Sequence, residues 1–505
     1  MTPTDGSREE AAPCRAVLDR DFTVGDIDPR MCGSFVEHLG RVVYSGIYEP
    51  GHPEADAAGF RGDVLELVRA LGVTLVRYPG GNFVSAYDWR DGIGPRERRP
   101  RRLDPAWRTI ETNAFGLDEF LAWSKSAGVE PFLVFNLGTE GVRSACDMVE
   151  YLNADTSSAL ADLRRANGHA APYGVRLFGL GNEMDGAWQI GSRSAAEYGA
   201  LASQVATAVK RIDAGVELVA AGSSKRTMRT FPEWDRVVLE HVYDDVEYFA
   251  LHQYYPANAK DVQSFAASSA DFEELVAAGV ATCDYVGELK RSRRKMSLSI
   301  DEWNVNYLDD PAEVRVPWQE APAFAEFDYT RLDAVVAGSL LIPLIRHADR
   351  VRVACQSLLV NVGAPILARR GGAAEKLAIY APIAEVFARL AGATALGLSL
   401  RSPELSTDAY GEVPQLDAAA VTRPEDGHVS LICVNRSLVR PAELEVEARG
   451  WGRPSRARAQ AITGCREEHD SAFEPLEVIL GEGHTVRCTL PAGSFAVLDL
   501  ELEAQ

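Results

Sequence analysis

The sequence predicts a (β/α)8 TIM barrel followed by a carboxy-terminal antiparallel, jelly-roll-like β-sandwich. Short apolar runs alternate with amphipathic segments as far as about residue 385, and single apolar residues alternate with polar ones after it. The length of 505 residues exceeds what one hydrophobic core normally supports, so two domains are expected. Strands that alternate with helices indicate parallel β units joined by right-handed crossovers.

Eight apolar runs are expected to be the strands of the barrel. They are 33–36, 73–76, 131–135, 175–180, 216–220, 246–251, 296–300 and 351–355. The helices between them are predicted from apolar stripes at three- and four-residue spacing, in 64–71, from 115 to 121 onward, and in 193–213, 263–289 and 325–346. Gly72 and Gly128 stand just before strands, where a left-handed helix cap is expected. A doubly wound open sheet is the alternative, but no Gly-x-Gly-x-x-Gly opens a helix after a strand.

The last part of the chain has the alternation of an antiparallel sheet. Leu444, Val446 and Ala448 alternate with charged residues, as do Cys488 and Leu490 with their neighbours. Gly, Pro and Asp separate these runs. The predicted sandwich comprises residues 386–505, and the polar residues 1–18 are expected either to lie along the surface or to pair with this later sheet.

Charge and cysteine content exclude several classes of protein. Asp and Glu number 73 against 52 Lys and Arg, and the net charge of −21 argues against a nucleic-acid partner. The eight cysteines are scattered without Cys-x-x-Cys spacing, so neither a disulfide framework nor a zinc site is expected. The amino-terminal segment lacks the apolar core of a leader peptide, and no run is long enough to cross a membrane. We therefore expect a cytoplasmic protein without a membrane partner.

One basic run interrupts this acidic chain. Residues 96–102 read Arg-Glu-Arg-Arg-Pro-Arg-Arg, which superficially resembles a nucleic-acid patch. The run is short and interrupted by proline, so a solvated loop or a contact between subunits is the preferred interpretation.

Two glutamates stand directly after predicted strands. Glu183 follows the run 175–180, and Glu302 follows the run 296–300. Because the carboxyl ends of all barrel strands open onto one face, the two side chains can converge on one substrate. Glycoside hydrolysis uses such a pair: one carboxylic acid protonates the leaving oxygen, and the second carboxylate acts at the anomeric carbon. A single buried glutamate could be a paired structural residue, so the prediction depends on the two together.

Further polar side chains follow the other strands. Arg77 would hold a nucleophilic carboxylate ionised, and Tyr254 could donate a hydrogen bond to it. Asn182, beside Glu183, could bind the 2-hydroxyl of a sugar, and His252 could bind substrate or orient the acid. The structural alternatives are an ion-pair partner for Arg77 and a satisfied core residue for His252. No cluster with metal-ligand spacing and no Gly-x-Ser-x-Gly motif occurs, so no metal and no cofactor are expected.

Six motifs occur in a fixed order along the barrel region. They are Glu37-His38-Leu39-Gly40-Arg41, Arg77-Tyr78-Pro79-Gly80-Gly81-Asn82-Phe83, Glu111-Thr112-Asn113, Gly181-Asn182-Glu183-Met184-Asp185-Gly186, His252-Gln253-Tyr254-Tyr255 and Asp301-Glu302-Trp303-Asn304-Val305. Together they resemble the α-L-arabinofuranosidases of glycoside hydrolase family 51, over about residues 20–385. The sandwich also matches that family's architecture, in which the first residues of the chain join the carboxy-terminal domain. The resemblance thus implies a barrel of residues 19–385 and a sandwich of residues 1–18 plus 386–505.

The resemblance implies an activity and a set of site residues. We expect a retaining, exo-acting hydrolase that releases terminal α-L-arabinofuranosyl residues from oligosaccharides, with Glu183 as acid/base and Glu302 as nucleophile. The expected contacts to substrate or nucleophile are Glu37, Arg77, Asn82, Asn182, His252 and Tyr254. The family also implies an intracellular, metal-independent enzyme that is a homo-oligomer, often a hexamer.

Two positions depart from the family pattern. Asn306 stands where the family usually has Trp, and Leu358 where it usually has Gln. Both side chains are expected to lie against the bound sugar. An alternative is therefore a retaining furanosidase of altered specificity, such as a β-D-galactofuranosidase. A sugar-binding protein that has lost catalysis is a further alternative, which the presence of both glutamates disfavours.

Overall fold

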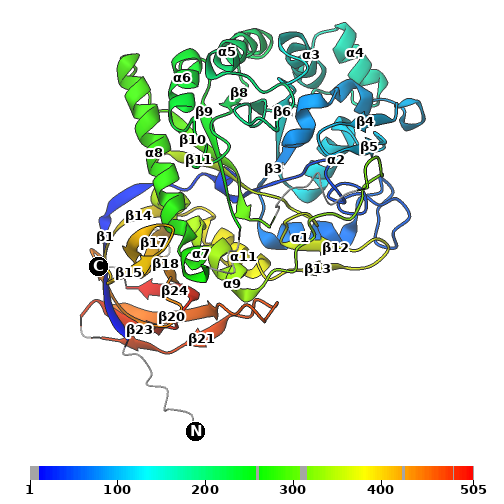
Figure 1. Cartoon of the computed structure of the whole chain (residues 1–505). Helices are drawn as coiled ribbons and strands as arrows, with labels where there is room; N and C mark the ends of the chain where they lie inside the picture. Colours follow the sequence, from blue (N-terminus) through cyan, green and yellow to red (C-terminus); the bar gives the residue numbers. More distant parts are fainter. Residues whose placement is uncertain (1–10, 257–260, 308–315, 424–426, 482, 504–505) are drawn as a thin grey trace.

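The computed structural model of the chain describes residues 11–256, 261–307, 316–423, 427–481 and 483–503. Within these ranges, eight parallel strands close into a barrel and ten others form one large, mostly antiparallel sheet. Figure 1 shows the two as adjacent lobes, with helices around the barrel and the large sheet below it. The predicted fold class is therefore confirmed.

Each predicted barrel strand has an observed counterpart. In order around the barrel they are β2 (Gly33–Phe35), β3 (Leu75–Tyr78), β6 (Glu130–Phe135), β7 (Leu177–Leu180), β8 (Glu217–Ala220), β9 (Tyr248–Tyr255), β10 (Ser297–Val305) and β11 (Val351–Gln356). The barrel closes where Cys355 of β11 pairs with Gly33 of β2. A Cβ on Gly33 would lie 2.4 Å from the carbonyl oxygen of Ala354, so this seam requires a glycine.

Two strands extend four or five residues beyond their predicted carboxyl ends. β9 continues to Tyr255 and β10 to Val305, so the polar motifs predicted to follow these strands lie within them. The two extensions pair with each other, with Glu302 opposite His252 and Asn304 opposite Tyr254. Polar side chains are tolerated here because they face a shared cavity and bond to one another, which a one-dimensional pattern does not reveal.

Helices connect the barrel strands, and three of them, over 142–153, 159–166 and 233–242, were not predicted. They are α1 (Gly62–Leu71), α2 (Leu117–Ala127), α3 (Val142–Asn153), α4 (Ala159–Ala166), α5 (Ala195–Ile212), α6 (Glu233–Val242), α7 (Val262–Ala266), α8 (Ser268–Leu289), α9 (Arg331–Ser339), α10 (Leu341–Arg346) and, after β11, α11 (Tyr380–Leu390). Gly72 and Gly128 are left-handed caps, with φ of 83° and 80°. The single helices predicted over 263–289 and 325–346 are wrong in detail, because each is two helices and the second pair begins at Arg331.

The carboxy-terminal lobe is built on a ten-stranded sheet. Its order is β21 (Glu474–Leu476), β20 (Pro454–Thr463), β24 (Ser494–Leu502), β18 (His428–Asn435), β17 (Leu416–Arg423), β14 (Thr394–Arg401), β1 (Ala12–Asp26), β19 (Ala442–Arg449), β23 (Thr485–Leu490) and β22 (Val478–Leu480). β1 runs antiparallel to β14 but parallel to β19, which departs from the predicted all-antiparallel sandwich. β1 comes from the amino-terminal end of the chain, so no short turn joins it to β19. The two strands therefore need not be antiparallel. The domain limits at residues 18 and 385 stay a prediction.

Three two-stranded hairpins complete the fold. They are β4 (Arg102–Asp104) with β5 (Thr109–Glu111), β12 (Ile366–Ala368) with β13 (Ala374–Lys376), and β15 (Glu404–Thr407) with β16 (Gly411–Pro414). The basic run ends at Arg102, the first residue of β4, and two of its arginines pair within the chain: Arg99 with Glu119, and Arg102 with Asp91. All eight cysteines are free thiols, as predicted. Among the helices in the described ranges, none has the length and apolar character that a membrane span requires.

Candidate active site

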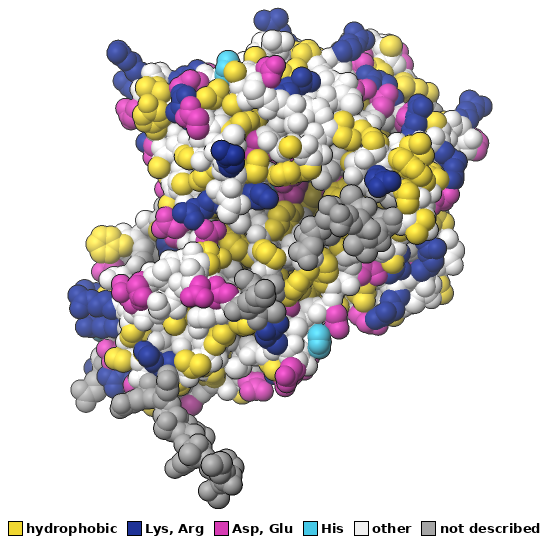
Figure 2. All heavy atoms as spheres, in the orientation of Figure 1, with side chains coloured by type: hydrophobic (Ala, Val, Ile, Leu, Met, Phe, Trp, Pro, Cys, Tyr) yellow, Lys and Arg dark blue, Asp and Glu magenta, His cyan; other side chains and the backbone are white. Residues whose placement is uncertain are grey.

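A cavity of about 850 Å³ opens where the barrel strands end. Its wall includes Glu183, Glu302, Glu37, Asn82 and Tyr254. In Figure 2 this side of the molecule is hollowed near its centre, and hydrophobic side chains gather around the hollow. The cavity therefore combines apolar surface with a small number of convergent polar groups, which is typical of a small-molecule site.

Glu302 is buried and held by two donors. Arg77 Nη1 donates to its Oε1 at 2.7 Å, and the Tyr254 hydroxyl lies 2.7 Å from its Oε2. The same hydroxyl lies 2.7 Å from Ser357 Oγ. Burial, together with the charge of Glu302, holds the pKa of Tyr254 well above its usual value, so the phenol keeps its proton and can donate.

Arg77 is fully buried and connects three neighbours. Its Nη2 donates to Asn182 Oδ1 at 2.6 Å, and its Nε lies 3.2 Å from Asp301 Oδ2. The guanidinium carbon also lies 4.7 Å from the centre of the Phe35 ring. Burial alone would lower the pKa of Arg77, but the charges of Asp301 and Glu302 outweigh it and raise that pKa. The pKa of Asp301 is lowered, because Arg77 and His252 outweigh its burial.

Glu183 stands in the turn that follows β7. Its backbone has φ of 45°, a left-handed conformation that is uncommon for a residue with a side chain. Trp188 Nε1 donates to Glu183 Oε2 at 2.6 Å, and His252 Nδ1 lies 3.1 Å from Oε1. Each oxygen of this carboxyl group therefore has its own partner, which fixes the orientation of the group toward the cavity.

His252 lies among three carboxylates. Its Nδ1 is 3.1 Å from Glu183 and 3.7 Å from Glu302, and its Nε2 is 3.3 Å from Asp301 Oδ1. Burial alone would lower the pKa of His252, but the charge of Glu302 and the hydrogen bonds with Asp301 and Glu183 raise it to about 10. The raised pKa favours the imidazolium at neutral pH, in which each ring nitrogen carries a proton and faces a carboxylate.

The two glutamates approach each other closely. Within the described residues, the possible ligand atoms of Glu183, His252 and Glu302 all lie within 4.8 Å of one another. Carboxyl groups stand about 5–5.5 Å apart in retaining glycosidases and about 6.5–9.5 Å apart in inverting ones, so the geometry fits the retaining class.

Glu37 and Asn82 complete the polar wall. Phe83 N and Trp107 Nε1 donate to Glu37 Oε1 at 2.9 and 2.8 Å. Burial raises the pKa of Glu37 to about 8, since these two hydrogen bonds only partly offset it and the charges of Glu302 and Asp104 add to it. Asn82 Oδ1 lies 3.5 Å from Asn182 Nδ2. Five of the eight predicted site residues line the cavity, and the other three, Arg77, Asn182 and His252, are buried and bonded to them.

Comparison with known proteins gives the family. Residues 67–261 match the profile described as the alpha-L-arabinofuranosidase 1 domain, and residues 301–495 match the alpha-L-arabinofuranosidase C-terminal domain. An intracellular exo-α-(1→5)-L-arabinofuranosidase of Streptomyces lividans is 51% identical over 440 residues, which are 86% of this chain and 66% of that protein. An exo-α-(1→6)-L-arabinofuranosidase of Bifidobacterium longum is 42% identical over 517 residues, covering 98% of this chain and 99% of that one.

Solved structures agree. A family 51 α-L-arabinofuranosidase from Bifidobacterium longum has a TM-score of 0.90 at 41% identity, covering 97% of this chain and 100% of that chain. This chain belongs to the α-L-arabinofuranosidases of glycoside hydrolase family 51. A family member from Thermotoga maritima, solved as an arabinose complex, has a TM-score of 0.82 at 29% identity, with coverage of 97% and 100%.

The two departures from the family 51 pattern both lie on the cavity wall, as expected. Asn306 and Leu358 are lining residues, and Leu358 is almost completely buried. Asn306 N donates to the carbonyl of Tyr255 at 3.1 Å, which places it directly after the paired ends of β9 and β10. These positions therefore border the space that a sugar would occupy.

The structure adds four residues that sequence reasoning did not assign. Asp301 contacts both Arg77 and His252, Trp188 contacts Glu183, Trp107 contacts Glu37, and Ser357 contacts Tyr254. Asp301 carried a signal, because it precedes Glu302 in a predicted strand end. Trp107 and Ser357 carried none, since their loops reach the cavity only through tertiary packing.

Proposed function

We propose that this chain is a retaining, exo-acting α-L-arabinofuranosidase that works by double displacement. The observation that carries the proposal is the pair of glutamates whose oxygens lie within 4.8 Å, one of them bonded to both Arg77 and Tyr254. Glu302 attacks the anomeric carbon while Glu183 protonates the leaving oxygen, which gives a covalent glycosyl-enzyme. Water then attacks this intermediate as Glu183 takes its proton, and Glu302 is released.

The surrounding residues have distinct roles in these steps. Arg77 and Tyr254 hold Glu302 in the orientation that a nucleophile needs. When Glu302 becomes an ester and loses its charge, Arg77 is still paired with the charge of Asp301. The imidazolium of His252 orients Glu183. Asn182, fixed by Arg77, is placed to bind the sugar 2-hydroxyl, a contact that strengthens in the transition state. Glu37, with Asn82 nearby, is placed to bind other sugar hydroxyls.

The physiological setting is a further part of the proposal. The names of the Streptomyces lividans and other relatives include the word intracellular, which supports a cytoplasmic location. The substrate is an arabinofuranosyl oligosaccharide, with neither nucleic acid nor membrane as a partner. Family resemblance supports a homo-oligomer, and we propose that it is a hexamer. Light scattering would measure the mass of the assembly.

The decisive test is release of 4-nitrophenol from its α-L-arabinofuranoside. We expect turnover by the wild type and a loss of about 10³-fold or more in Glu183→Ala and Glu302→Ala, since each removes a reacting group. Azide should restore turnover to Glu183→Ala, giving an arabinosyl azide of retained configuration. The matched β-D-galactofuranoside tests the altered-specificity alternative. A wild type that binds arabinose but turns over neither glycoside would instead be the binding protein, and would contradict the proposal.

A further inference from the structure

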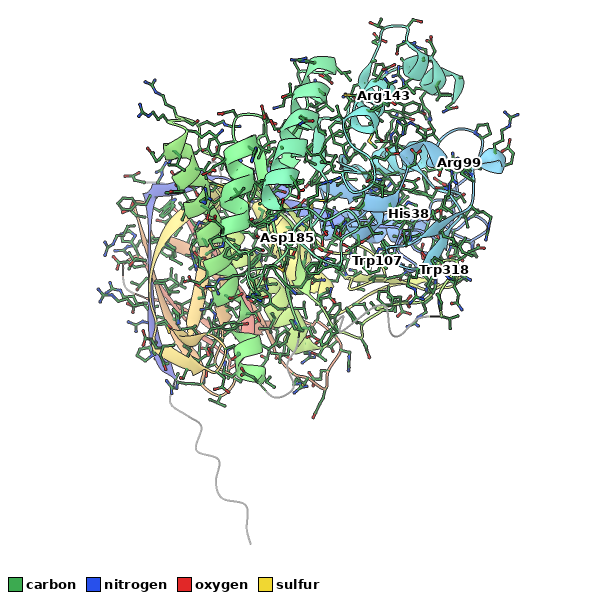
Figure 3. The ribbon with its side chains drawn as sticks, turned by 45° about the horizontal axis from the view of Figure 1, so that its top comes forward. His38, Arg99, Trp107, Arg143, Asp185 and Trp318 are labelled. Carbon is green, nitrogen blue, oxygen red and sulfur yellow. The ribbon has the colours of Figure 1, made fainter. Side chains whose placement is uncertain are left out.

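Glu37 and His38 stand just after β2, and both bond to the same hairpin. Glu37 Oε1 accepts a hydrogen bond from Trp107 Nε1 at 2.8 Å, and His38 Nδ1 lies 2.7 Å from Glu111 Oε2. Trp107 stands in the turn between β4 and β5, and Glu111 is the last residue of β5. Figure 3 shows His38 and Trp107 near each other. The hairpin is therefore tied to the end of β2 both at its turn and at its base.

The contact at the base of the hairpin involves a buried carboxylate. His38 and Glu111 are both buried, and the described residues that line the cavity include neither of them. The backbone N of Asn113 donates to Glu111 Oε1 at 2.6 Å, and the hydroxyl of Tyr44 donates to the same oxygen. Burial alone would raise the pKa of Glu111, but its interactions with His38, Tyr44 and Asn113 lower it, so the group is ionised. A buried carboxylate is costly to leave unpaired, so this contact resists displacement.

The loop after β3 holds His38 from the other side. The hydroxyl of Tyr78 lies 2.8 Å from His38 Nε2. The ring of Phe83 stacks on the imidazole, with 4.7 Å between the ring centres and 18° between the planes. The backbone N of Phe83 is also the second donor to Glu37 Oε1, at 2.9 Å. His38 thus packs between the two segments that supply the hydrogen bonds to Glu37.

The turn that carries Trp107 is fixed within the hairpin. Asp104 of β4 accepts hydrogen bonds from the backbone N of Ala106 and of Trp107, at 2.9 and 3.1 Å. The ion pair between Arg102 and Asp91 also holds the hairpin, but the Arg102 side chain is 62% exposed, and exposed ion pairs contribute little. Because the turn is rigid, the position of the Trp107 indole depends on how the base of the hairpin sits against the barrel.

We propose that His38 and Glu111 are positioning residues, which hold the hairpin against the barrel so that Trp107 keeps Glu37 in place for the sugar. They act through Trp107 and Glu37 and do not themselves touch the substrate. The inference rests on the proposed function, in which Glu37 binds sugar hydroxyls. It gives a role to His38 and to the motif that begins at Glu111, neither of which takes part in the proposed chemistry.

A double-mutant cycle on 4-nitrophenyl α-L-arabinofuranoside tests this dependence. His38→Phe removes the bond to Glu111 and keeps a ring that stacks on Phe83. Trp107→Phe removes the N–H that Glu37 accepts. Each variant should lower kcat/KM about 10-fold. The double variant should also lose about 10-fold, and not the roughly 100-fold of two independent effects, because both changes break the same line of contacts.

A second cycle is the matched control. Trp188→Phe removes an indole N–H that is bonded to Glu183, in the loop after β7. Combined with His38→Phe, its effect on kcat/KM should multiply, because the two contacts are independent.

Two conservative variants separate positioning from packing. The side-chain amide of His38→Asn takes the place of Nδ1 and still donates to Glu111, whereas that of His38→Gln takes the place of Nε2 and reaches only Tyr78. The Asn variant should keep kcat/KM within about 3-fold of the wild type, and the Gln variant should lose about 10-fold.

Several outcomes would overturn the inference. They are full activity of His38→Phe, effects of His38→Phe and Trp107→Phe that multiply, and equal activity of the Asn and Gln variants. Any of these would mean that His38 only fills space in the core. If His38→Phe does not fold, Glu111→Gln replaces it in the same cycle with Trp107→Phe. Absence of wild-type turnover would instead show that the proposed function fails.

Discussion

Glu37 carries a proton at neutral pH because it is buried beside another carboxylate. Its pKa is raised by burial to about 8, against 4.5 for an ordinary glutamate, and the charge of Glu302 contributes to the shift. A protonated carboxyl can both donate and accept a hydrogen bond, which suits a sugar hydroxyl. It also adds no second negative charge beside the nucleophile. The environment, and not the residue type alone, therefore defines this role.

This shift predicts a pH dependence of stability. Between pH 4.5 and about 8 the folded state holds a proton on Glu37 that the unfolded chain releases, so the pKa shift costs stability as pH rises. The free energy of unfolding of the wild type, relative to Glu37→Gln, should fall by up to about 1.4 kcal/mol per pH unit in this window. Urea unfolding of the wild type and Glu37→Gln at pH 5 and pH 8 measures this change in the free energy of unfolding. A difference between the two proteins that is constant with pH would contradict the prediction.

The surroundings of His252 also set its pKa, and here they favour the positively charged form. Its two ring nitrogens meet Glu183 and Asp301, and Glu302 lies 3.7 Å away, so the imidazolium neutralises part of an acidic cluster. The residue type and its place near the end of a strand could be predicted from the sequence. Its protonation depends on carboxylates from the turn after β7 and from β10, which come near only in the folded barrel.

At the scale of single elements, the loop after β3 fits closely against the catalytic groups. A Cβ on Gly81 would lie 3.0 Å from Glu302 Oε1 and 3.4 Å from both Asn182 Nδ2 and Glu37 Oε2. The glycine therefore leaves the space in which three site side chains meet. Glycine is required here because the polar groups approach the backbone, rather than to permit a left-handed turn.

We therefore expect Gly81→Ala to impair catalysis more than folding. The new methyl group should displace the Glu302 carboxylate by a fraction of an ångström, and kcat/KM on the 4-nitrophenyl arabinofuranoside should fall about 10²-fold. The melting temperature should change by only a few degrees. Gly141→Ala is the control, since its Cβ would meet only Leu201, at 3.6 Å, in extended backbone. Equal activity in the two variants would refute this account of the loop.

At the scale of the whole molecule, a buried ion cluster joins the two lobes. Asp417 of β17 accepts a hydrogen bond from Arg436 Nη2 at 2.6 Å and is also bonded to Arg346 of α10. Arg346 Nη1 lies 2.7 Å from Glu273 of α8. Burial alone would raise the pKa of Asp417, but the two arginines lower it, so it stays ionised. The large sheet is thereby fixed against the barrel helices on which the catalytic strands depend.

Removing the central charge should destabilise the protein. Asp417→Asn leaves Arg436 buried without its anion, and breaking a buried pair costs about 3–5 kcal/mol. Urea unfolding should show that loss. Glu445→Gln removes an anion near Arg487 and Arg15 on the exposed face of the same sheet, and should cost at most about 1 kcal/mol. Similar losses in both variants would show that the cluster does not join the lobes as proposed.

The sequence by itself determined the alternation of strands and helices, the sheet-forming tail and the positions of both glutamates, because these depend on local periodicity and on the end of each strand. The tertiary structure decided the strand ends, the strand directions and the site residues that local periodicity does not determine. β9 and β10 extend through their polar motifs because these side chains pair across a shared cavity. β1 lies parallel to β19 because it enters the sheet from the far end of the chain. Trp107 and Ser357 became site residues only when folding brought separate loops and strands together, since hydrogen bonds act over distance in space and not along the sequence.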